Sequence, residues 1–308
     1  MTTRPFPTDT KRTAIAIGYK NTNLIADKVL PYETVPAEKF SYLKHTIADG
    51  FTLPDTKVGR KSDPNSVSFS AEDKIEKVEA YGLDDYIPQS DIDNAPENYD
   101  PVNRSVIGIM DLILLDREKR VADFVLNKDN YSANKKVLTN AQRFGTATTG
   151  LDPFTVITDA IDAMLMKPNQ MTLGGKLWNF LKSCDSITSA YFGSANAGRV
   201  LKPQELAELF EMNEIIVGSS FVNTAKKGQV VNLAKCWKSS ILLAHQNPVT
   251  VNSGTFGFTA RHGDRIVGSQ EVKKKGLTGG TEVWAGEFVK EVMCSEAHGY
   301  LIDNCLAD

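Results

Sequence analysis

The stretch "DPVNRSVIGIMDLILLDREKRVADFVLN", residues 100–127, carries the clearest helix signal in the chain. Asp100 can cap a helix, and Pro101 would occupy the first helical position, where its missing N–H costs nothing. Apolar residues then recur at helical spacing: Ile107, Met110, Leu114, Val121 and Phe124. Residues 106–115 are apolar nearly all round, which predicts packing on more than one side. A helix over residues 101–127 would be about 40 Å long, which is typical of a strut.

The segment before this helix predicts a long hairpin with a polar tip. "KFSYLKHTI" alternates apolar and polar residues, and "SVSFSA" places Val67, Phe69 and Ala71 on one face. The connection between the two strands holds turn-forming residues: Gly50, Pro54, Gly59 and Pro64. A two-stranded ribbon alone is marginal in water, so we expect this one to rest on its own domain or on another molecule.

Charge is distributed unevenly around this hairpin. Its tip carries three basic residues, Lys57, Arg60 and Lys61. Residues 72–100, which look like an extended connector, hold ten carboxylates against two lysines, a net charge of −8. A hairpin of this length tends to hold its tip away from its own base, so we expect the tip to dock on acidic residues of an adjacent identical subunit. Such a head-to-tail contact would match the two patches and could propagate around a ring. The acceptors expected are Asp84, Asp85, Asp91 and Asp93. Binding of a divalent cation by these paired carboxylates is an alternative.

The chain after residue 150 has the pattern of an α/β unit. "LDPFTVITDAIDAMLM" repeats the Asp-Pro helix start, and further short helices are predicted in "GKLWNFLKS" and "KPQELAELFEM". Strands are predicted in "QMTLG", "EIIVGSSF", "SSILLAHQ", "GTFGFTARHGDRIVGS" and "TEVWAGEFVKEVMCSEAHGYLIDNCLA". We expect the last strands to return to the sheet beside the long helix.

Composition excludes several classes of protein. The net charge is −3, so no overall basic field is available to hold nucleic acid. Four cysteines and four histidines are scattered without zinc-ligand spacing. The longest apolar run, "SVIGIMDLILL", is short and interrupted by Asp111, which predicts no membrane span.

Sequence motifs of catalysis are incomplete. "LGGKLW" resembles a phosphate loop, but Leu177 replaces the required Ser/Thr. Cys294 and His298 lie four residues apart in a predicted strand, a spacing that does not aim them at one substrate. We therefore expect no catalytic residue, no metal and no cofactor. An α/β enzyme with the hairpin as a lid remains a remote alternative.

The order of parts resembles the major capsid proteins of tailed bacteriophages, which have the Hong Kong 97-type fold. The local sequence is similar to capsid proteins of Mu-like transposable phages and prophages. The stretches that carry this likeness are "NTNLIADKVLP", "DGFTLPDTKVGRKSDPNSVSFS", "GLDDYIPQSDIDNAP", "DLILLDREKRVADFV", "AELFEMNEIIVG", "NTAKKGQ" and "GTFGFTARHGDR". None is a chemical signature, and the resemblance implies no catalytic residues.

The resemblance implies an α+β fold in which the chain divides into five segments. Its parts are an N-terminal arm (1–37), an extended hairpin or E-loop (38–73), a peripheral domain with the spine helix (74–149), an inserted axial α/β domain (150–275) and return strands of the peripheral domain (276–308). An E-loop packs on the neighbouring subunit of a shell. This agrees with the expectations that the ribbon rests on another molecule and that its basic tip docks on an adjacent subunit.

The resemblance also implies a function and partners. The chain would self-assemble, as hexamers and pentamers, into the icosahedral shell around the double-stranded DNA of a tailed phage or prophage. The arm is too short to be a scaffolding region, so a separate scaffolding protein is expected, together with portal and decoration proteins. DNA would be enclosed without sequence-specific binding, and no membrane is involved. Assembly would take place in the bacterial cytoplasm, and the product is the virion capsid. An encapsulin-type nanocompartment of the same fold is the alternative.

Overall fold

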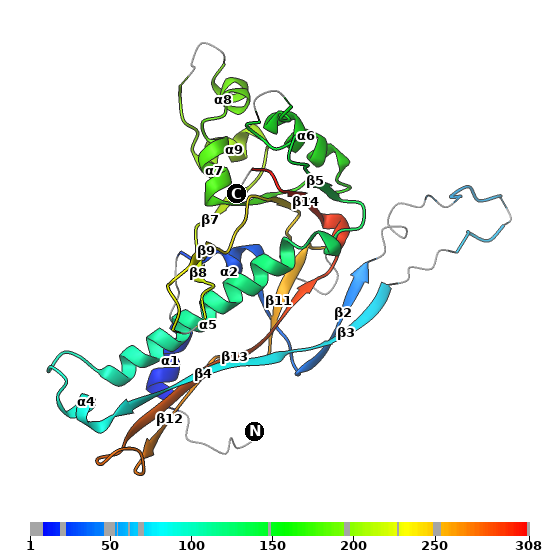
Figure 1. Cartoon of the computed structure of the whole chain (residues 1–308). Coiled ribbons are helices and arrows are strands. Elements are labelled where there is room, and N and C mark those ends of the chain that lie inside the picture. The colour runs from blue at the N-terminus through cyan, green and yellow to red at the C-terminus, as the bar shows by residue number, and fades with distance from the viewer. Residues whose placement is uncertain are drawn as a thin grey trace.

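The fold was obtained as a computed structural model of the whole chain (Figure 1). The structure describes residues 9–18, 23–45, 53, 55–60, 62–66, 71–146, 149–193, 198–226, 228–248 and 254–306. Its α-helices are α1 (Thr10–Gly18), α2 (Ala26–Val29), α4 (Gln89–Asp93), α5 (Pro101–Val125), α6 (Pro153–Ala163), α7 (Gly175–Leu181), α8 (Asp185–Phe192) and α9 (Pro203–Leu209). Short 3₁₀ turns span Lys128–Asn130 and Glu296–His298.

The strands form two larger sheets and two hairpins. In chain order they are β1 (Tyr32–Thr34), β2 (Lys39–His45), β3 (Ala71–Lys77), β4 (Glu79–Pro88), β5 (Lys135–Val137), β6 (Gln170–Gly174), β7 (Glu214–Gly218), β8 (Phe221–Asn223), β9 (Leu233–Lys235), β10 (Ile241–Ala244), β11 (Gly257–Arg261), β12 (Ile266–Val272), β13 (Gly280–Met293) and β14 (Gly299–Asp303). The mixture of helices and sheets is the α+β content expected from the sequence.

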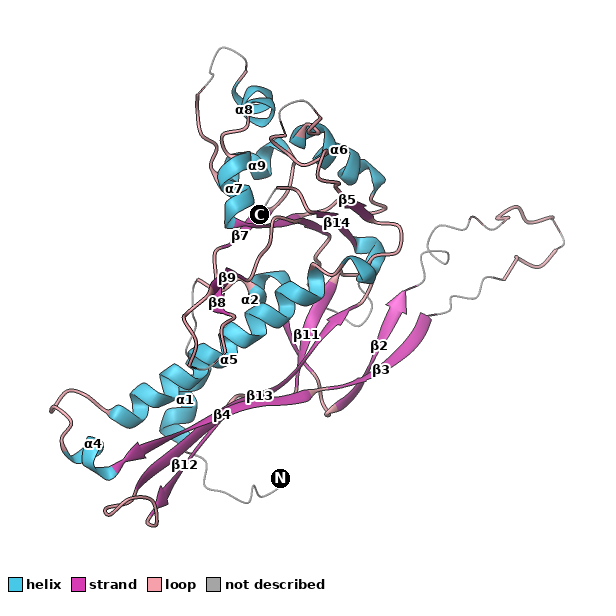
Figure 2. Ribbon diagram, viewed as in Figure 1, coloured by secondary structure: helices cyan, strands magenta, loops and turns pink. Residues whose placement is uncertain are grey.

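The predicted strut is the helix α5, which runs diagonally across the molecule (Figure 2). The Asp100 carboxylate accepts hydrogen bonds from the backbone N–H groups of Val102 and Asn103, at 2.9 and 3.1 Å. Pro101 occupies the first turn, as predicted. The helix ends at Val125, two residues before the predicted end. Among the helices that the structure describes, α5 included, none has the length and apolar character needed to cross a membrane.

Beneath α5 lies the first large sheet, which is organised by the long strand β13. β13 pairs antiparallel with β4 along one side and with β11 and then β12 along the other. β1 continues the sheet in parallel with β11. Val283 and Ala285 of β13 pack against Val106 and Met110 of α5 in one apolar cluster. We call this sheet with α5 the peripheral layer.

The N-terminal arm lies on the peripheral layer of its own chain. Ala16 in α1 is buried, and its carbonyl accepts a 3.1 Å hydrogen bond from the Arg265 guanidinium. Val29 and Leu30, at the end of α2, are fully buried against α5. The arm is therefore anchored by buried residues that its weak sequence pattern did not predict.

The predicted hairpin is formed by β2 and β3, which pair antiparallel from Lys39 with Lys77 to His45 with Ala71. Its base is anchored, since Phe40 packs in one cluster with Phe258 and Val292. The predicted strand residues Val67 and Phe69 lie outside the described residues. The acidic residues 72–100 are more ordered than the expected connector, because they form most of the hairpin strand β3 and then β4 and α4.

The second large sheet has the strand order β5-β14-β10-β6-β7 and is covered by α6 to α9 (Figure 1). Its core packs Leu173, Ile241 and Ile302 against Leu177 and Leu206 of the helices. The short helices and strands predicted after residue 150 are present at their expected places. We call this sheet with its helices the axial layer.

The observed strand pairing shows that three strands lie in a different sheet from the one expected. β14 was expected in the peripheral sheet, but it lies between β5 and β10 in the axial sheet. β11 and β12, assigned to the axial domain at residues 150–275, pair with β13 in the peripheral sheet. Of the expected return segment 276–308, β13 alone joins the peripheral sheet. The chain thus crosses between the layers twice after β10, and hydrophobic pattern alone does not reveal which sheet a buried strand enters.

Candidate subunit interface

The hairpin tip presents basic side chains to solvent. Lys57 and Arg60 are both exposed, and Lys61 lies outside the described residues. Asp55 organises this part of the loop: its carboxylate accepts a 3.0 Å hydrogen bond from the Lys57 backbone N–H, and its carbonyl accepts one from the Asn65 amide at 2.8 Å. The tip is therefore charged, shaped by local hydrogen bonds, and placed beyond the ends of β2 and β3 (Figure 1).

The four predicted acidic acceptors do not form one patch. Successive residues of a strand point to opposite faces of the sheet, and this separates Asp84 from Asp85 on β4. The Asp85 carboxylate accepts a 2.6 Å hydrogen bond from the Ser105 hydroxyl on α5. Asp84 is the cross-strand neighbour of Trp284 and lies on the face turned away from α5.

A lysine already influences the surroundings of Asp84. The pKa of Lys275 is raised, first by the hydrogen bond of its ammonium group to Glu282, and Asp84 adds to the effect through its negative charge. Asp84 therefore faces a cation within its own chain and is a weaker candidate for an outside partner than a carboxylate without one nearby.

Asp91 and Asp93 lie together on the short helix α4, and both are exposed. The Asp93 carboxylate accepts a hydrogen bond from the Gln89 side chain at 2.8 Å, and Asp91 accepts one from the Ser90 hydroxyl at 3.3 Å. These local contacts leave carboxylate lone pairs for further donors. Of the predicted acceptors, this pair is the best placed to receive a basic loop.

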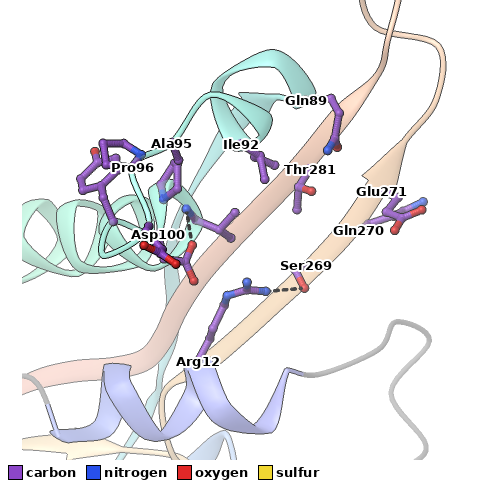
Figure 3. Close-up of a pocket in the computed structure, with 14 residues that line it drawn as sticks. Arg12, Gln89, Ile92, Ala95, Pro96, Asp100, Ser269, Gln270, Glu271 and Thr281 are labelled. Atoms are coloured by element: carbon purple, nitrogen blue, oxygen red, sulfur yellow. Dashed lines mark hydrogen bonds between the residues drawn. The ribbon is translucent and has the colours of Figure 1, made fainter.

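A groove of about 650 Å³ opens beside α4, between the start of α5, α1 and the ends of β12 and β13 (Figure 3). Its wall includes three carboxylates and one guanidinium: Glu97, Asp100, Glu271 and Arg12. The Arg12 guanidinium is held within the chain by Asp9 at 2.7 Å and by Asn103 at 3.1 Å. The groove is thus acidic on balance and adjoins Asp91 and Asp93.

Sequence reasoning missed this groove because it depends on β12. Glu271 was assigned to a different domain from Glu97, and only the pairing of β12 with β13 brings the two together. No local signal in the sequence predicts that pairing. The acidic residues 72–100 supply Glu97 and Asp100 to the wall of the groove.

The basic tip and the acidic groove lie at opposite ends of the molecule. In Figure 1 the hairpin projects past one side of the chain, while α4 and the start of α5 form the far end of the other side. The two surfaces therefore cannot meet within one chain of this shape. Their opposite charges can be matched only between two molecules.

The body between these surfaces is fixed by buried charges on α5 that the sequence did not single out. Glu118 is fully buried, and one carboxylate oxygen accepts hydrogen bonds from the backbone N–H groups of Ile25 and Ala26, at 2.9 and 2.8 Å. The other oxygen accepts from the Ser220 hydroxyl at 3.0 Å and the Trp237 indole at 2.6 Å. One side chain thus joins the arm, the spine helix and the axial layer.

Its neighbour Arg117 is equally buried and makes a second set of bonds. The guanidinium pairs with Asp27 and donates to the Leu30 carbonyl at 3.0 Å and the Thr259 hydroxyl at 3.1 Å. It also lies 3.9 Å from the centre of the Tyr32 ring. Buried charges need partners, and here the two terminal nitrogens of the guanidinium are bonded, whereas Nε has no partner. These bonds join the arm, α5 and β11.

Two observations concern the catalytic and metal-binding candidates weighed from the sequence. Burial raises the pKa of the Cys294 thiol to about 12, which opposes formation of a nucleophilic thiolate. The described part of the chain brings together no group of three or more His, Cys, Asp or Glu side chains suited to a metal ion.

Two curated proteins are similar to this chain in sequence. The major capsid protein of Pseudomonas phage JBD67 is 40% identical over 310 residues, which covers 100% of both chains. The chain belongs to the family of phage major capsid proteins. The major capsid protein of Burkholderia phage BcepMu is 27% identical and covers 76% of this chain and 74% of its own. No protein-family model matches the sequence.

Solved structures show the fold of this capsid protein. A phage-related protein from Bordetella bronchiseptica RB50 superimposes with a TM-score of 0.76 at 21% identity, covering 99% of both chains. The capsid of the cyanophage P-SCSP1u gives a TM-score of 0.59 at 9% identity, covering 100% of this chain and 94% of its own. The expectation of a Hong Kong 97-type, α+β capsid fold is confirmed, as is the similarity to Mu-like capsid proteins.

Proposed function

We propose that this capsid protein self-assembles into the icosahedral shell that encloses the double-stranded DNA of a tailed phage or prophage. The observation that carries the proposal is the full-length similarity, at 40% identity, to a phage major capsid protein. The same similarity favours a phage head over an encapsulin-type nanocompartment. The protein is then a structural subunit and no enzyme, located in the virion after assembly in the host cytoplasm.

The second part of the proposal concerns how subunits meet. Lys57, Arg60 and Lys61 of one subunit dock at the acidic end of the next, with Asp91 and Asp93 beside the groove as the main acceptors and Asp84 and Asp85 as weaker ones. Support comes from the exposure of Lys57, Arg60 and the four aspartates, from opposite charge, and from the placement of the hairpin and α4 at opposite ends of the chain. An exposed ion pair contributes only about 0.2–1 kcal/mol, but a shell repeats the contact in every subunit.

Reversal of the three basic residues tests this contact. The variant Lys57→Glu, Arg60→Glu, Lys61→Glu should keep the circular dichroism spectrum of the wild type, because the two positions that the structure describes are exposed. Its particle yield should fall at low salt and recover in part at high salt, since ions screen the new repulsion. A matched control reverses three lysines elsewhere: the exposed Lys128 and Lys202 and the half-buried Lys182. Equal particle yields from the two variants across the salt series would refute the contact.

Further partners follow from a shell and are proposed with it. The subunit would form both hexamers and pentamers, would assemble around a separate scaffolding protein, and would contact portal and decoration proteins. A net charge of −3 suits a wall that encloses DNA without gripping it, because each phosphate contact strengthens binding. Analysis of purified particles distinguishes the alternatives: DNA content supports a phage head, whereas a cargo enzyme would identify a nanocompartment.

A further inference from the structure

A second hairpin, formed by β8 and β9, exposes apolar side chains far from the E-loop. Its strands pair Phe221 with Lys235 and Asn223 with Leu233 on the outer face. The outer face and the tip carry large hydrophobic residues in contact with solvent: Phe221 (50% exposed), Val230 (90%), Val231 (64%) and Leu233 (62%). Four such residues on one small hairpin form a patch of the kind that marks an interaction surface.

The hairpin is shaped in advance of any partner. The Asn223 side-chain oxygen accepts hydrogen bonds from the backbone N–H groups of Ala225 and Asn232, at 3.1 and 3.0 Å. The Thr224 N–H donates to the Asn232 carbonyl at 2.9 Å and closes the loop. On the inner face, Val222 packs against the cluster that contains Trp237. A preformed surface binds with less loss of conformational entropy than a disordered one.

The charged side chains of this hairpin are all basic. Residues 221–235 contain three lysines and no acidic residue. Lys226 and Lys235 are exposed, and the Lys235 ammonium lies 5.8 Å from the centre of the Phe221 ring. The surface is thus apolar with a basic rim, and a partner should be apolar with an acidic rim.

The opposite edge of the axial layer has that character. Residues 152–166, which include α6, contain three aspartates and no lysine or arginine. Asp159 and Asp162 are exposed on the helix, beside the exposed hydrophobic residues Leu165 and Met166 that follow it. Lys136 on the adjacent strand β5 lies 3.8 Å from Asp159, so Asp162 is the freer of the two carboxylates.

The two surfaces belong to opposite edges of one sheet. β7, which leads into the β8–β9 hairpin, is the last strand at one edge, and β5, beside α6, is the last strand at the other (Figure 2). Complementary patches on opposite edges of identical subunits make a head-to-tail contact, which closes into a ring when the rotation permits.

We propose that the β8–β9 hairpin docks on the α6 surface of a second copy of this chain, as an axial contact separate from the E-loop contact. The inference rests on the proposed function, because it assumes that subunits form rings. Figure 1 shows α6 on the same side of the molecule as the E-loop, and the β8–β9 hairpin on the same side as α4. Both proposed contacts therefore join the same two sides of neighbouring molecules. The E-loop side would give a basic tip to an acidic groove in one contact, and an acidic helix to a basic hairpin in the other.

Cross-linking tests the contact directly. The full chain would carry Val231→Cys and Ala163→Cys in a Cys184→Ser background, since Cys184 is the native thiol that is not buried. Treatment of assembled particles with a short bismaleimide should give a ladder of covalent multimers on a denaturing gel. The control pair, Leu277→Cys with Ala163→Cys, replaces the hairpin position by a fully exposed residue at the far end of the peripheral layer and should give none.

A charge exchange provides the second measurement. Lys226→Glu with Lys235→Glu should reduce particle yield several-fold, and so should Asp159→Lys with Asp162→Lys. The fourfold variant that combines both changes should recover most of the wild-type yield. If wild-type particles form normally but the cysteine pair yields no ladder and the fourfold variant shows no recovery, this contact is wrong and the shell function stands. If the wild type forms no particles under any condition, the proposed function itself fails.

Discussion

The indole nitrogen of Trp237 donates a 2.6 Å hydrogen bond to the carboxylate of Glu118, and both side chains are buried. Glu118 lies in the middle of the spine helix, whereas Trp237 follows β9 on the way to the axial sheet. A methyl group at Gly218, at the end of β7, would overlap the Trp237 ring, so that glycine provides the space in which the indole packs. A single buried contact therefore sets the separation between α5 and the edge of the axial layer.

Loss of the Glu118 carboxylate should destabilise the subunit strongly. Glu118→Ala leaves four buried donors without their acceptor, and each unsatisfied buried group costs about 1–3 kcal/mol. We expect the free energy of unfolding to fall by at least about 3 kcal/mol, measured by urea denaturation of the unassembled protein. Glu118→Gln keeps one acceptor oxygen and should lie between this variant and the wild type. Glu97→Ala, at an exposed carboxylate, should change stability by less than about 0.5 kcal/mol.

Two leucines on α5 allow a matched test of helix orientation. Leu114 is 6% exposed, and Leu112 is 57% exposed on the same helix. Leu114→Asp would bury an unpaired charge at a cost of several kcal/mol, so this variant should accumulate as insoluble protein. Leu112→Asp should remain soluble and folded by circular dichroism. Recovery of a soluble, folded Leu114→Asp protein would contradict the burial of this face.

The proposed acceptors lie on two different elements, α4 and β4, so variants can show which of the two receives the E-loop tip. If the tip docks beside the groove, Asp91→Lys with Asp93→Lys should lower particle yield at low salt by more than Asp84→Lys with Glu79→Lys. Asp84 and Glu79 already face Lys275 and Lys290 of their own chain, and Glu79 lies 2.8 Å from the Lys290 ammonium. Particle yield by sedimentation at several salt concentrations checks the order. The reverse order would place the acceptor on β4.

High pH should weaken the fold through the half-buried Tyr42 and the buried Cys294. Burial raises the pKa values of Tyr42 and Cys294 to about 12, above their ordinary values near 10 and 9. The unfolded chain loses these protons at lower pH than the folded chain, so the stabilisation is complete below about pH 9 and is lost as pH rises to 12. Tyr42→Phe should make the decline between pH 10 and 12 less steep in thermal unfolding. Tyr99→Phe, at an exposed tyrosine, should leave the slope unchanged.

Local features of the fold could be predicted from the sequence, because their signals are local. The start of α5 follows from Asp100 and Pro101, whose capping and ring geometry act within one turn. The alternation of Phe40 and Tyr42 likewise identified β2. The exposed, charged tip around Lys57 followed from composition alone.

Features that depend on distant strand pairing could not be predicted. Leu301 and Ile302 have the pattern of a buried strand, but both sheets offer buried positions, and nothing in the segment selects the axial one. The groove could not be predicted for the same reason, because the pairing of β12 with β13 brings Glu271 close to α4. The burial of Arg117 and Glu118 could not be predicted either, since burial of a charge depends on partners such as Asp27 and Trp237 that are remote in sequence.

The position of β14 has a consequence for biosynthesis. β14 is an interior strand of the axial sheet, between β5 and β10, yet it is translated after every other strand of that sheet. Domains generally fold as units while the chain emerges from the ribosome, but this sheet would contain a gap until residues 299–303 have been made. A nascent chain that terminates early would lack Leu301 and Ile302 from two apolar clusters and would leave β5 without its partner. A subunit truncated before residue 299 would therefore have an incomplete axial sheet and two incomplete apolar clusters.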